Sequence, residues 1–202
     1  MKNIPYVSFM VSPRIVREVA KERAEIAAVI VNAMNGIFVV GAIALPMQSL
    51  FTISLVVFQI LLFGPLVGFV VSSLYSRVEL TVGRRLGGKA SFDELYRLFA
   101  WAILPVGFAA LLYGLILLML KQASTATEII ASIPSLVIFC CAIRNYCSNI
   151  IVFQQFTKTR GAVSVVLTLV LFIILIAGGI GFLSLLFRYG MGESLKSIFT
   201  QL

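Results

Sequence analysis

The fold is decided by one long stretch that contains no charged side chain, IAAVIVNAMNGIFVVGAIALPMQSLFTISLVVFQILLFGPLVGFVVSSLYS, residues 26–76. A helix needs about 20 apolar residues to cross the hydrocarbon core of a bilayer, so this stretch has room for two crossings. Its least apolar part is PMQS at residues 46–49, which suits a tight turn. We therefore predict a hairpin of two membrane-spanning helices, over residues 26–45 and 50–75.

Three further apolar segments follow at residues 98–120, 130–153 and 162–187, and only Arg144 interrupts them. Of all residues 12% are charged and 60% are hydrophobic, whereas about a quarter of the residues of a soluble domain are charged. This composition excludes a soluble globular enzyme. The chain is predicted to be an all-α integral membrane protein, a single domain of five transmembrane helices over residues 1–202.

The basic residues are distributed unevenly between the two sides of the predicted membrane. The segments before span one, between spans two and three, and between spans four and five together contain 12 Lys and Arg residues, against 3 in the segments on the other side. Lys and Arg are enriched on the cytoplasmic side of membrane proteins. We therefore expect the N-terminus in the cytoplasm and the C-terminus outside. This arrangement also accounts for the net charge of +8 without a nucleic-acid partner.

The segment before the first span is predicted to form a short amphipathic helix. Ser12 is a good N-cap, and Pro13 suits the first helical position. One face of the helix is apolar and the other is charged, with Ile15, Val16, Val19 and Ala20 opposite Arg17, Glu18, Lys21 and Glu25. Such a helix lies in the membrane interface, where it either only anchors the first span or also attracts anionic lipid.

The segment of residues 77–97, between spans two and three, contains GRRLGGKAS at residues 83–91, a near miss to a phosphate-binding loop. That loop needs Ser or Thr directly after its Lys to ligate magnesium. Ala90 stands there, so we exclude nucleotide hydrolysis. The same residues suit a turn at Gly87 and Gly88, followed by a helix that Ser91 and Glu94 start as a capping box.

Arg144 lies within the fourth span, where an unpaired charge is costly. No acid falls within the predicted spans, so its candidate partners are amides. We predict a buried polar site that consists of Arg144, Asn145, Asn149, Asn32, Asn35 and Gln59. Two interpretations of this site stay open. It forms either a polar cavity or anion site, or a set of hydrogen bonds that holds the helices together.

No catalytic or metal-binding set is recognisable, so we predict no enzyme, no cofactor and no metal. Histidine is absent, which removes the usual general base and the commonest metal ligand. All three cysteines, Cys140, Cys141 and Cys147, fall within an apolar run and are interpreted as buried small hydrophobic residues rather than a disulfide framework. The spacing Gly64-xxx-Gly68 indicates a close helix contact, either within one chain or between copies in a homo-oligomer.

Three local patterns stand out together: SPRIVRE at residues 12–18, GGKASFDEL at residues 87–95, and LFAWAILP at residues 98–105. In this order they resemble the Yip family of Ypt/Rab-interacting membrane proteins. The resemblance implies a non-enzymatic membrane protein, because eukaryotic members associate with prenylated Rab-type GTPases and with one another. About 25 residues precede the first span here, in place of a long soluble region. This difference favours a prokaryotic-type member in the plasma (inner) membrane.

The first functional hypothesis is a scaffold or adaptor that engages a membrane-protein partner, a GTPase-like partner or anionic lipid through a basic cytoplasmic face. The residues of that face are Arg14, Arg17, Lys21, Arg84, Arg85 and Lys89. The alternative is a small-solute or ion transporter or channel that uses the buried polar site around Arg144.

Overall fold

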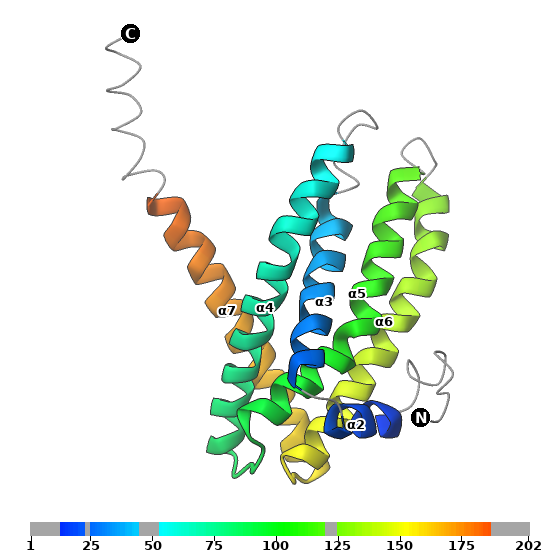
Figure 1. Ribbon diagram of the computed structural model, residues 1–202. Helices are drawn as coiled ribbons and strands as arrows, with labels where there is room; N and C mark the ends of the chain where they lie inside the picture. Colours follow the sequence, from blue (N-terminus) through cyan, green and yellow to red (C-terminus); the bar gives the residue numbers. More distant parts are fainter. Residues whose placement is uncertain (1–12, 23–24, 45–52, 120–124, 187–202) are drawn as a thin grey trace, which may run out of the picture.

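The protein is a bundle of long helices in the computed structural model, which describes residues 13–22, 25–44, 53–119 and 125–186. In chain order the helices are α2 (Pro13–Glu22), α3 (Glu25–Ala44), α4 (Ile53–Arg85), α5 (Phe92–Met119), α6 (Thr125–Phe153) and α7 (Lys158–Leu186) (Figure 1). Five of the described helices are long and apolar enough to cross a membrane. The predicted all-α architecture, with five spans and a short N-terminal helix, is thereby confirmed.

Two helices extend well past the predicted spans. Helix α4 continues to Arg85, beyond the predicted end at residue 75, and α5 begins at Phe92, before the predicted start at residue 98. A charged residue ends an apolar run without ending a helix, and α4 stops only before the glycine pair Gly87 and Gly88. The connection predicted over residues 77–97 is therefore only a turn of residues 86–91. The turn predicted at residues 46–49 lies outside the described residues.

Helices α3 to α6 form the body of the bundle, and α7 leans away from it (Figure 1). Helix α3 packs closely on both α4 and α5, and α6 packs along α5. Helix α7 contacts α4 and α6, and its buried residues include Ser164 and Thr168 in its first turns. Farther along α7, a Cβ at Gly178, Gly179 or Gly181 would meet nothing within 4 Å. The small residues of that half therefore mark no contact among the described residues.

Glycines let α3 and α4 approach until their backbones touch. A Cβ added to Gly64 would lie 2.6 Å from Cα of Ile37, and one added to Gly68 would lie 2.9 Å from the carbonyl carbon of Asn32. One added to Gly36 would collide with the backbone of Gly64 and Gly68. The spacing Gly64-xxx-Gly68 therefore serves a contact within the chain, because small residues are what permits such close helix approach.

Helix α2 lies across the bundle at one end and packs on α5 and α6 (Figure 1). Its apolar face is covered, since Val16 and Ala20 are each 1% exposed and share a core with Leu98 and Ile150. This placement matches the predicted interfacial helix. Helix α2 is therefore part of the packed bundle.

The turn between α4 and α5 has the predicted local structure. Gly87 has a φ of 84°, and the amide of Gly88 donates to the carbonyl of Gly83 over 2.7 Å, which closes α4 in a Schellman motif. Helix α5 then starts with the predicted capping box. The amide of Ser91 donates to Oε2 of Glu94 over 2.8 Å, and the amide of Glu94 donates to Oγ of Ser91 over 3.3 Å.

Helix α6 ends in the same way, but without a glycine. The amide of Phe156 donates to the carbonyl of Ile151 over 2.8 Å, and the amide of Gln155 donates to the carbonyl of Val152 over 3.3 Å. This pattern requires a left-handed residue, and Gln155 adopts a φ of 57°. A side chain with a Cβ is strained in that conformation.

We therefore expect Gln155→Gly to stabilise the protein. Removing the Cβ strain gains about 1–2 kcal/mol, and the extra backbone freedom of glycine costs about 0.5–1 kcal/mol, so the net gain is about 0.5–1 kcal/mol. Thermal unfolding in detergent measures the change. Gln155→Ala is the control, because it keeps the Cβ and removes only the side chain. A glycine variant that melts below the alanine variant would contradict the expectation.

Candidate functional site

The residues predicted to form one buried polar site divide into two groups. The buried group consists of four asparagines, Asn32 and Asn35 on α3 and Asn145 and Asn149 on α6. The exposed group consists of Arg144 on α6 and Gln59 on α4. The structure therefore does not bring the six residues together in a single buried site.

Arg144 faces outward because of the helical period. Asn145 and Asn149 are four residues apart and share the buried face of α6, whereas Arg144 is rotated from Asn145 by about 100°. Arg144 precedes Asn149 by only about 7.5 Å along the helix axis, and Asn149 lies level with α2, since Arg17 contacts it. An arginine near the membrane boundary extends its charge toward the headgroups. Arg144 is therefore not part of the buried polar face of α6.

Two of the four buried asparagines, Asn35 and Asn149, make hydrogen bonds between helices, whereas the side-chain amide of Asn32 has no hydrogen-bond partner among the described residues. Nδ2 of Asn35 on α3 donates to the carbonyl of Ala100 on α5 over 3.1 Å. Oδ1 of Asn149 accepts a hydrogen bond from Nε of Arg17 on α2 over 3.1 Å, and Nδ2 of Asn149 donates to the carbonyl of Asn145 over 2.9 Å. These bonds join α3 to α5 and α2 to α6. They favour the interpretation in which the polar residues hold the helices together.

An acidic residue that the sequence assigned to a connecting segment is buried between α4 and α7. Glu79 is fully buried, and its Oε1 accepts a hydrogen bond from Oγ of Ser164 on α7 over 2.7 Å. Oε2 of Glu79 has no hydrogen-bond partner among the described residues. Ser72 and Ser76 are buried on the same face of α4. The helical spacing of residues 72, 76 and 79 is the sequence signal for this polar stripe.

Tyr75 fills the core one turn before this acid. The centroid of its ring lies 4.7 Å from that of Phe99 on α5, 5.8 Å from that of Tyr146 on α6 and 5.2 Å from that of Phe172 on α7. These separations are typical of favourable aromatic pairs. One side chain of α4 therefore connects three other helices.

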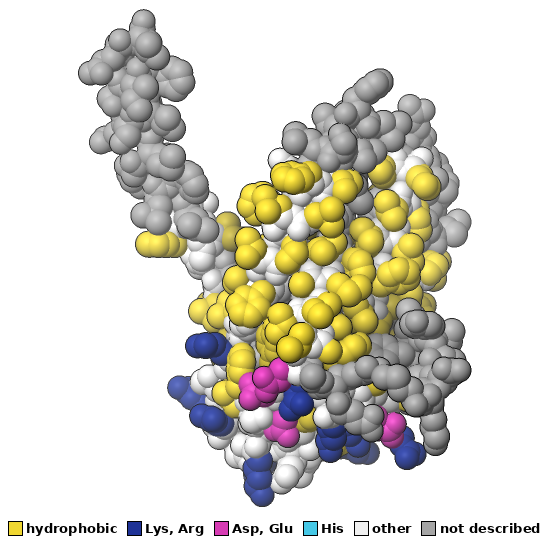
Figure 2. All heavy atoms as spheres, in the orientation of Figure 1, with side chains coloured by type: hydrophobic (Ala, Val, Ile, Leu, Met, Phe, Trp, Pro, Cys, Tyr) yellow, Lys and Arg dark blue, Asp and Glu magenta, His cyan; other side chains and the backbone are white. Residues whose placement is uncertain are grey.

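Exposed cations gather at one end of the bundle. Figure 2 shows dark blue side chains at this end, below a broad hydrophobic band. Arg84, Arg85 and Lys89 are exposed at the α4–α5 turn, and Lys158 and Arg160 are exposed at the start of α7. We call the surface formed by these five residues the basic end. By the positive-inside rule, we expect this end to face the cytoplasm.

The cations of α2 make contacts within the chain. Arg17 is bonded to α6, and Arg14 forms an ion pair with Glu18 at 3.0 Å. Nζ of Lys21 lies 5.8 Å from the ring centroid of Phe153, within the range of a cation–π contact. In the predicted cytoplasmic face, the cations on the α4–α5 turn therefore project outward. Arg17 instead helps to pack α2 against α6.

The turn that carries these outward cations is fastened to the end of α6 by the buried Gln154. Its Oε1 accepts a hydrogen bond from the amide of Ala90, and its carbonyl accepts one from the amide of Lys89, each over 3.3 Å. A Cβ added to Gly83 or Gly88 would collide with the Gln154 side chain. The two glycines therefore make room for the Gln154 side chain. The hydrogen bonds to Gln154 hold the backbone of the α4–α5 turn, which carries Arg84, Arg85 and Lys89, in one position.

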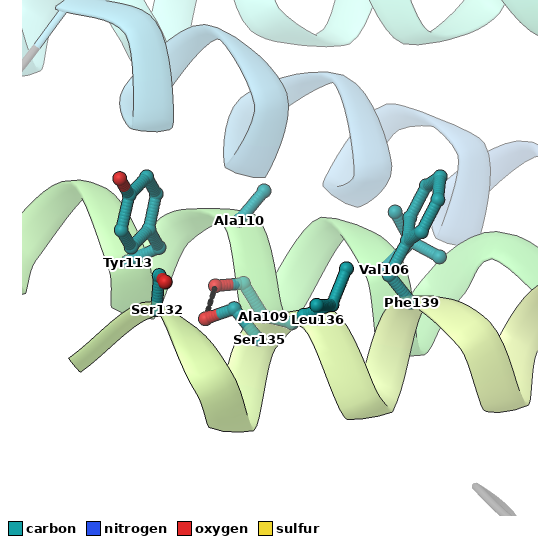
Figure 3. A pocket seen from close by; sticks show the side chains of 8 residues that line it. All are labelled: Val106, Ala109, Ala110, Tyr113, Ser132, Ser135, Leu136 and Phe139. Carbon is teal, nitrogen blue, oxygen red and sulfur yellow. Dashed lines mark hydrogen bonds between the residues drawn. The ribbon is translucent and has the colours of Figure 1, made fainter. Parts of the chain in front are cut away.

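A groove of about 360 Å³ opens between α5 and α6 (Figure 3). The residues that line it are mainly apolar, and its hydroxyl groups belong to Tyr113, Ser132 and Ser135. Oγ of Ser135 donates to the carbonyl of Ala109 over 3.3 Å, which joins α6 to α5 across the groove. The lining holds no charged residue and no group set up as a nucleophile. We interpret this groove as a space left by imperfect packing of α5 against α6, with one hydrogen bond linking the two helices across it.

The three cysteines carry no disulfide, and none is the buried packing residue predicted, since Cys140 is exposed and Cys141 and Cys147 are half-buried. Among the described residues, no group of three His, Cys, Asp or Glu side chains is placed to hold a metal ion. The geometry thus consists of a polar helix interior and a basic end. Comparison of the chain with models of known families, with curated proteins and with solved structures finds no match.

Proposed function

We propose that this integral membrane protein is a non-enzymatic adaptor whose basic end binds an acidic protein in the cytoplasm. The observation that carries the proposal is the gathering of exposed cations on two connections, one of them fastened by Gln154. A surface on which cations predominate attracts an oppositely charged partner and speeds their association. The resemblance to the Yip family, with a prokaryotic plasma (inner) membrane as the location, is part of the same proposal.

The depth of the cations favours a protein partner over lipid headgroups. Helix α2 lies across the bundle with its apolar face packed on α5 and α6, and we take its level as that of the lipid headgroups. In Figure 1 the α4–α5 and α6–α7 connections lie farther out than α2. Arg84, Arg85 and Lys89 therefore extend past the headgroup level, where a soluble acidic surface can meet them.

Charge reversal of Arg84 and Arg85 tests this proposal. We expect Arg84→Glu with Arg85→Glu to weaken binding of the partner about tenfold, equivalent to about 1.4 kcal/mol, because attraction becomes repulsion. A photo-crosslinking probe at Leu86, in native membranes, captures the partner, and the yield of the protein adduct is the measurement. Raising the salt concentration should reduce the same adduct, since exposed charges are screened.

Two controls distinguish an effect of charge on partner binding from an effect on folding and from nonspecific crosslinking. Arg84→Lys with Arg85→Lys keeps the charge and should keep the adduct. A probe at Ile174, on the exposed apolar part of α7, should give lipid adducts only. Adducts at Leu86 that persist after charge reversal, or that contain lipid alone, would show that the basic end does not bind an acidic protein.

A further inference from the structure

A second groove, of about 330 Å³, opens at the membrane boundary on the side of the bundle formed by α3, α4 and α5. Its lining combines the first residue of α3, Glu25, with Asp93 in the first turn of α5. Figure 2 shows acidic and basic side chains meeting just below the hydrophobic band. The groove volume lies at the lower end of the range for small-molecule sites, about 300–1,000 Å³.

The groove presents two cations and two acids that are not paired with one another. Arg77 and Arg97 line it together with Glu25 and Asp93. Among the described residues, the one ion pair within 4.0 Å is that of Arg14 with Glu18, neither of which lines this groove. Nε of Arg97 donates to the backbone carbonyl of Asp93 over 3.2 Å, and Arg77 lies over the ring of Phe92 at 5.8 Å. Within the part of the chain that the structure describes, neither carboxylate is engaged in an ion pair, so a ligand can take this role.

A buried hydroxyl supplies an independent sign of a ligand. Tyr96 lines the groove and is 8% exposed, yet its hydroxyl has no hydrogen-bond partner among the described residues. Leaving a buried hydroxyl without a partner is unfavourable, so such groups are usually satisfied. An acceptor in the groove would satisfy it. A phosphate oxygen is the acceptor that two neighbouring arginines would also attract.

The membrane side of the groove is apolar. Val29 and Phe69 line it and are 43% and 51% exposed. Both lie on the spans themselves, on α3 and α4, one turn or more from the charged residues. A molecule that fits the whole groove therefore has a polar part with charges of both signs, joined to a hydrocarbon part.

We propose that this groove binds one zwitterionic phospholipid with a phosphoethanolamine headgroup. Arg77, Arg97 and the Tyr96 hydroxyl hold the phosphate, and Glu25 and Asp93 accept hydrogen bonds from the ammonium group. The acyl chains run along Val29 and Phe69. Trimethylammonium offers no N–H donor to the carboxylates, and an anionic headgroup without an amine is repelled by them. The groove thus selects the amine-bearing lipid by charge and by hydrogen bonding.

Binding of three lipids with identical acyl chains tests the proposal: phosphatidylethanolamine, phosphatidylcholine and phosphatidylglycerol. Native mass spectrometry of the delipidated full chain in detergent gives the affinity for each. We expect phosphatidylethanolamine to bind about tenfold more tightly than the other two. Glu25→Gln with Asp93→Asn should remove that preference while leaving phosphatidylglycerol binding no weaker. Arg77→Gln with Arg97→Gln should weaken all three lipids about tenfold or more.

Tyr96→Phe is the variant that keeps the fold, because it removes one oxygen that has no partner among the described residues. We expect it to weaken binding of phosphatidylethanolamine about fivefold, and to melt no lower than the native chain in lipid-free detergent. Arg84→Gln with Arg85→Gln is the matched control, since these arginines lie outside the groove, and it should change binding less than twofold. Equal affinity for the three lipids, tightest binding of phosphatidylglycerol, or full binding by the carboxylate variant would overturn the proposal. The adaptor proposal does not depend on this outcome.

Discussion

Gly68→Val is expected to separate α3 from α4 and to leave little folded protein. The Cβ of valine would meet the backbone of Asn32 and Gly36, which have no freedom to move aside as a flexible side chain would. Overpacking a core lowers the free energy of unfolding by about 1–3 kcal/mol when side chains can adjust. Because the new side chain would meet backbone atoms, we expect a loss at or above the top of that range. The fraction of monodisperse protein after detergent extraction, with its melting temperature, measures the effect.

The control for this change is Gly179→Val in α7. The new side chain there would meet nothing within 4 Å, so the melting temperature should stay close to that of the native chain. Both substitutions add the same apolar side chain to a membrane helix, so hydropathy is matched. If Gly68→Val melted together with Gly179→Val, the close approach of α3 and α4 would be disproved.

Tyr75→Ala is expected to destabilise the protein by about 3 kcal/mol or more, as is usual when a buried aromatic ring is replaced by alanine. The ring of Tyr75 contacts Phe99, Tyr146 and Phe172, so the cavity would lie where four helices meet. Because the contact to Phe172 is one of those that hold α7 to the bundle, α7 should loosen first. Protease sensitivity of the α6–α7 connection and thermal unfolding together measure the loss.

Tyr75→Phe separates packing from the hydroxyl group. It keeps all three ring contacts, so we expect a loss of about 1 kcal/mol at most, the typical contribution of one hydrogen bond. Leu112→Ala is a second control, because it removes an apolar side chain that is 40% exposed on the membrane-facing surface. A phenylalanine variant as unstable as the alanine variant would show that the hydroxyl, and not the ring, supports the core.

The helices could be predicted from the sequence because charge-free runs of sufficient length have few alternatives in a membrane. The start of α5 could be predicted for a local reason, since Ser91 and Glu94 bond to each other's amides. The spacing of Gly64 and Gly68 predicted a close helix contact. It did not predict the partner in that contact, because Gly36 lies on another helix. Local chemistry therefore predicts elements and their ends, while the partners of each element are decided by packing.

The candidate site was harder to predict because burial depends on distant parts of the chain. Glu79 has the charge expected of a connecting segment, and Ser164, which bonds to it, lies 85 residues later. Arg144 is the reverse case, a residue expected to be buried that is exposed. Its position within an apolar run suggested burial, but a rotation of one residue separates it from the buried face that Asn145 and Asn149 share. For Arg144, one residue step along the helix decides between the interior and the exterior.

The bond between Gln154 and the α4–α5 turn has a consequence for the order of events during synthesis. Ala90 leaves the ribosome 64 residues before Gln154, its hydrogen-bond partner. Between these two moments the nascent chain has Gly83 and Gly88 without the side chain that covers them in the finished protein. The turn therefore gains its hydrogen bonds to Gln154 only after α6 has been made. The surface carrying Arg84, Arg85 and Lys89 is fixed to the bundle late, after four of the five long helices have been synthesised.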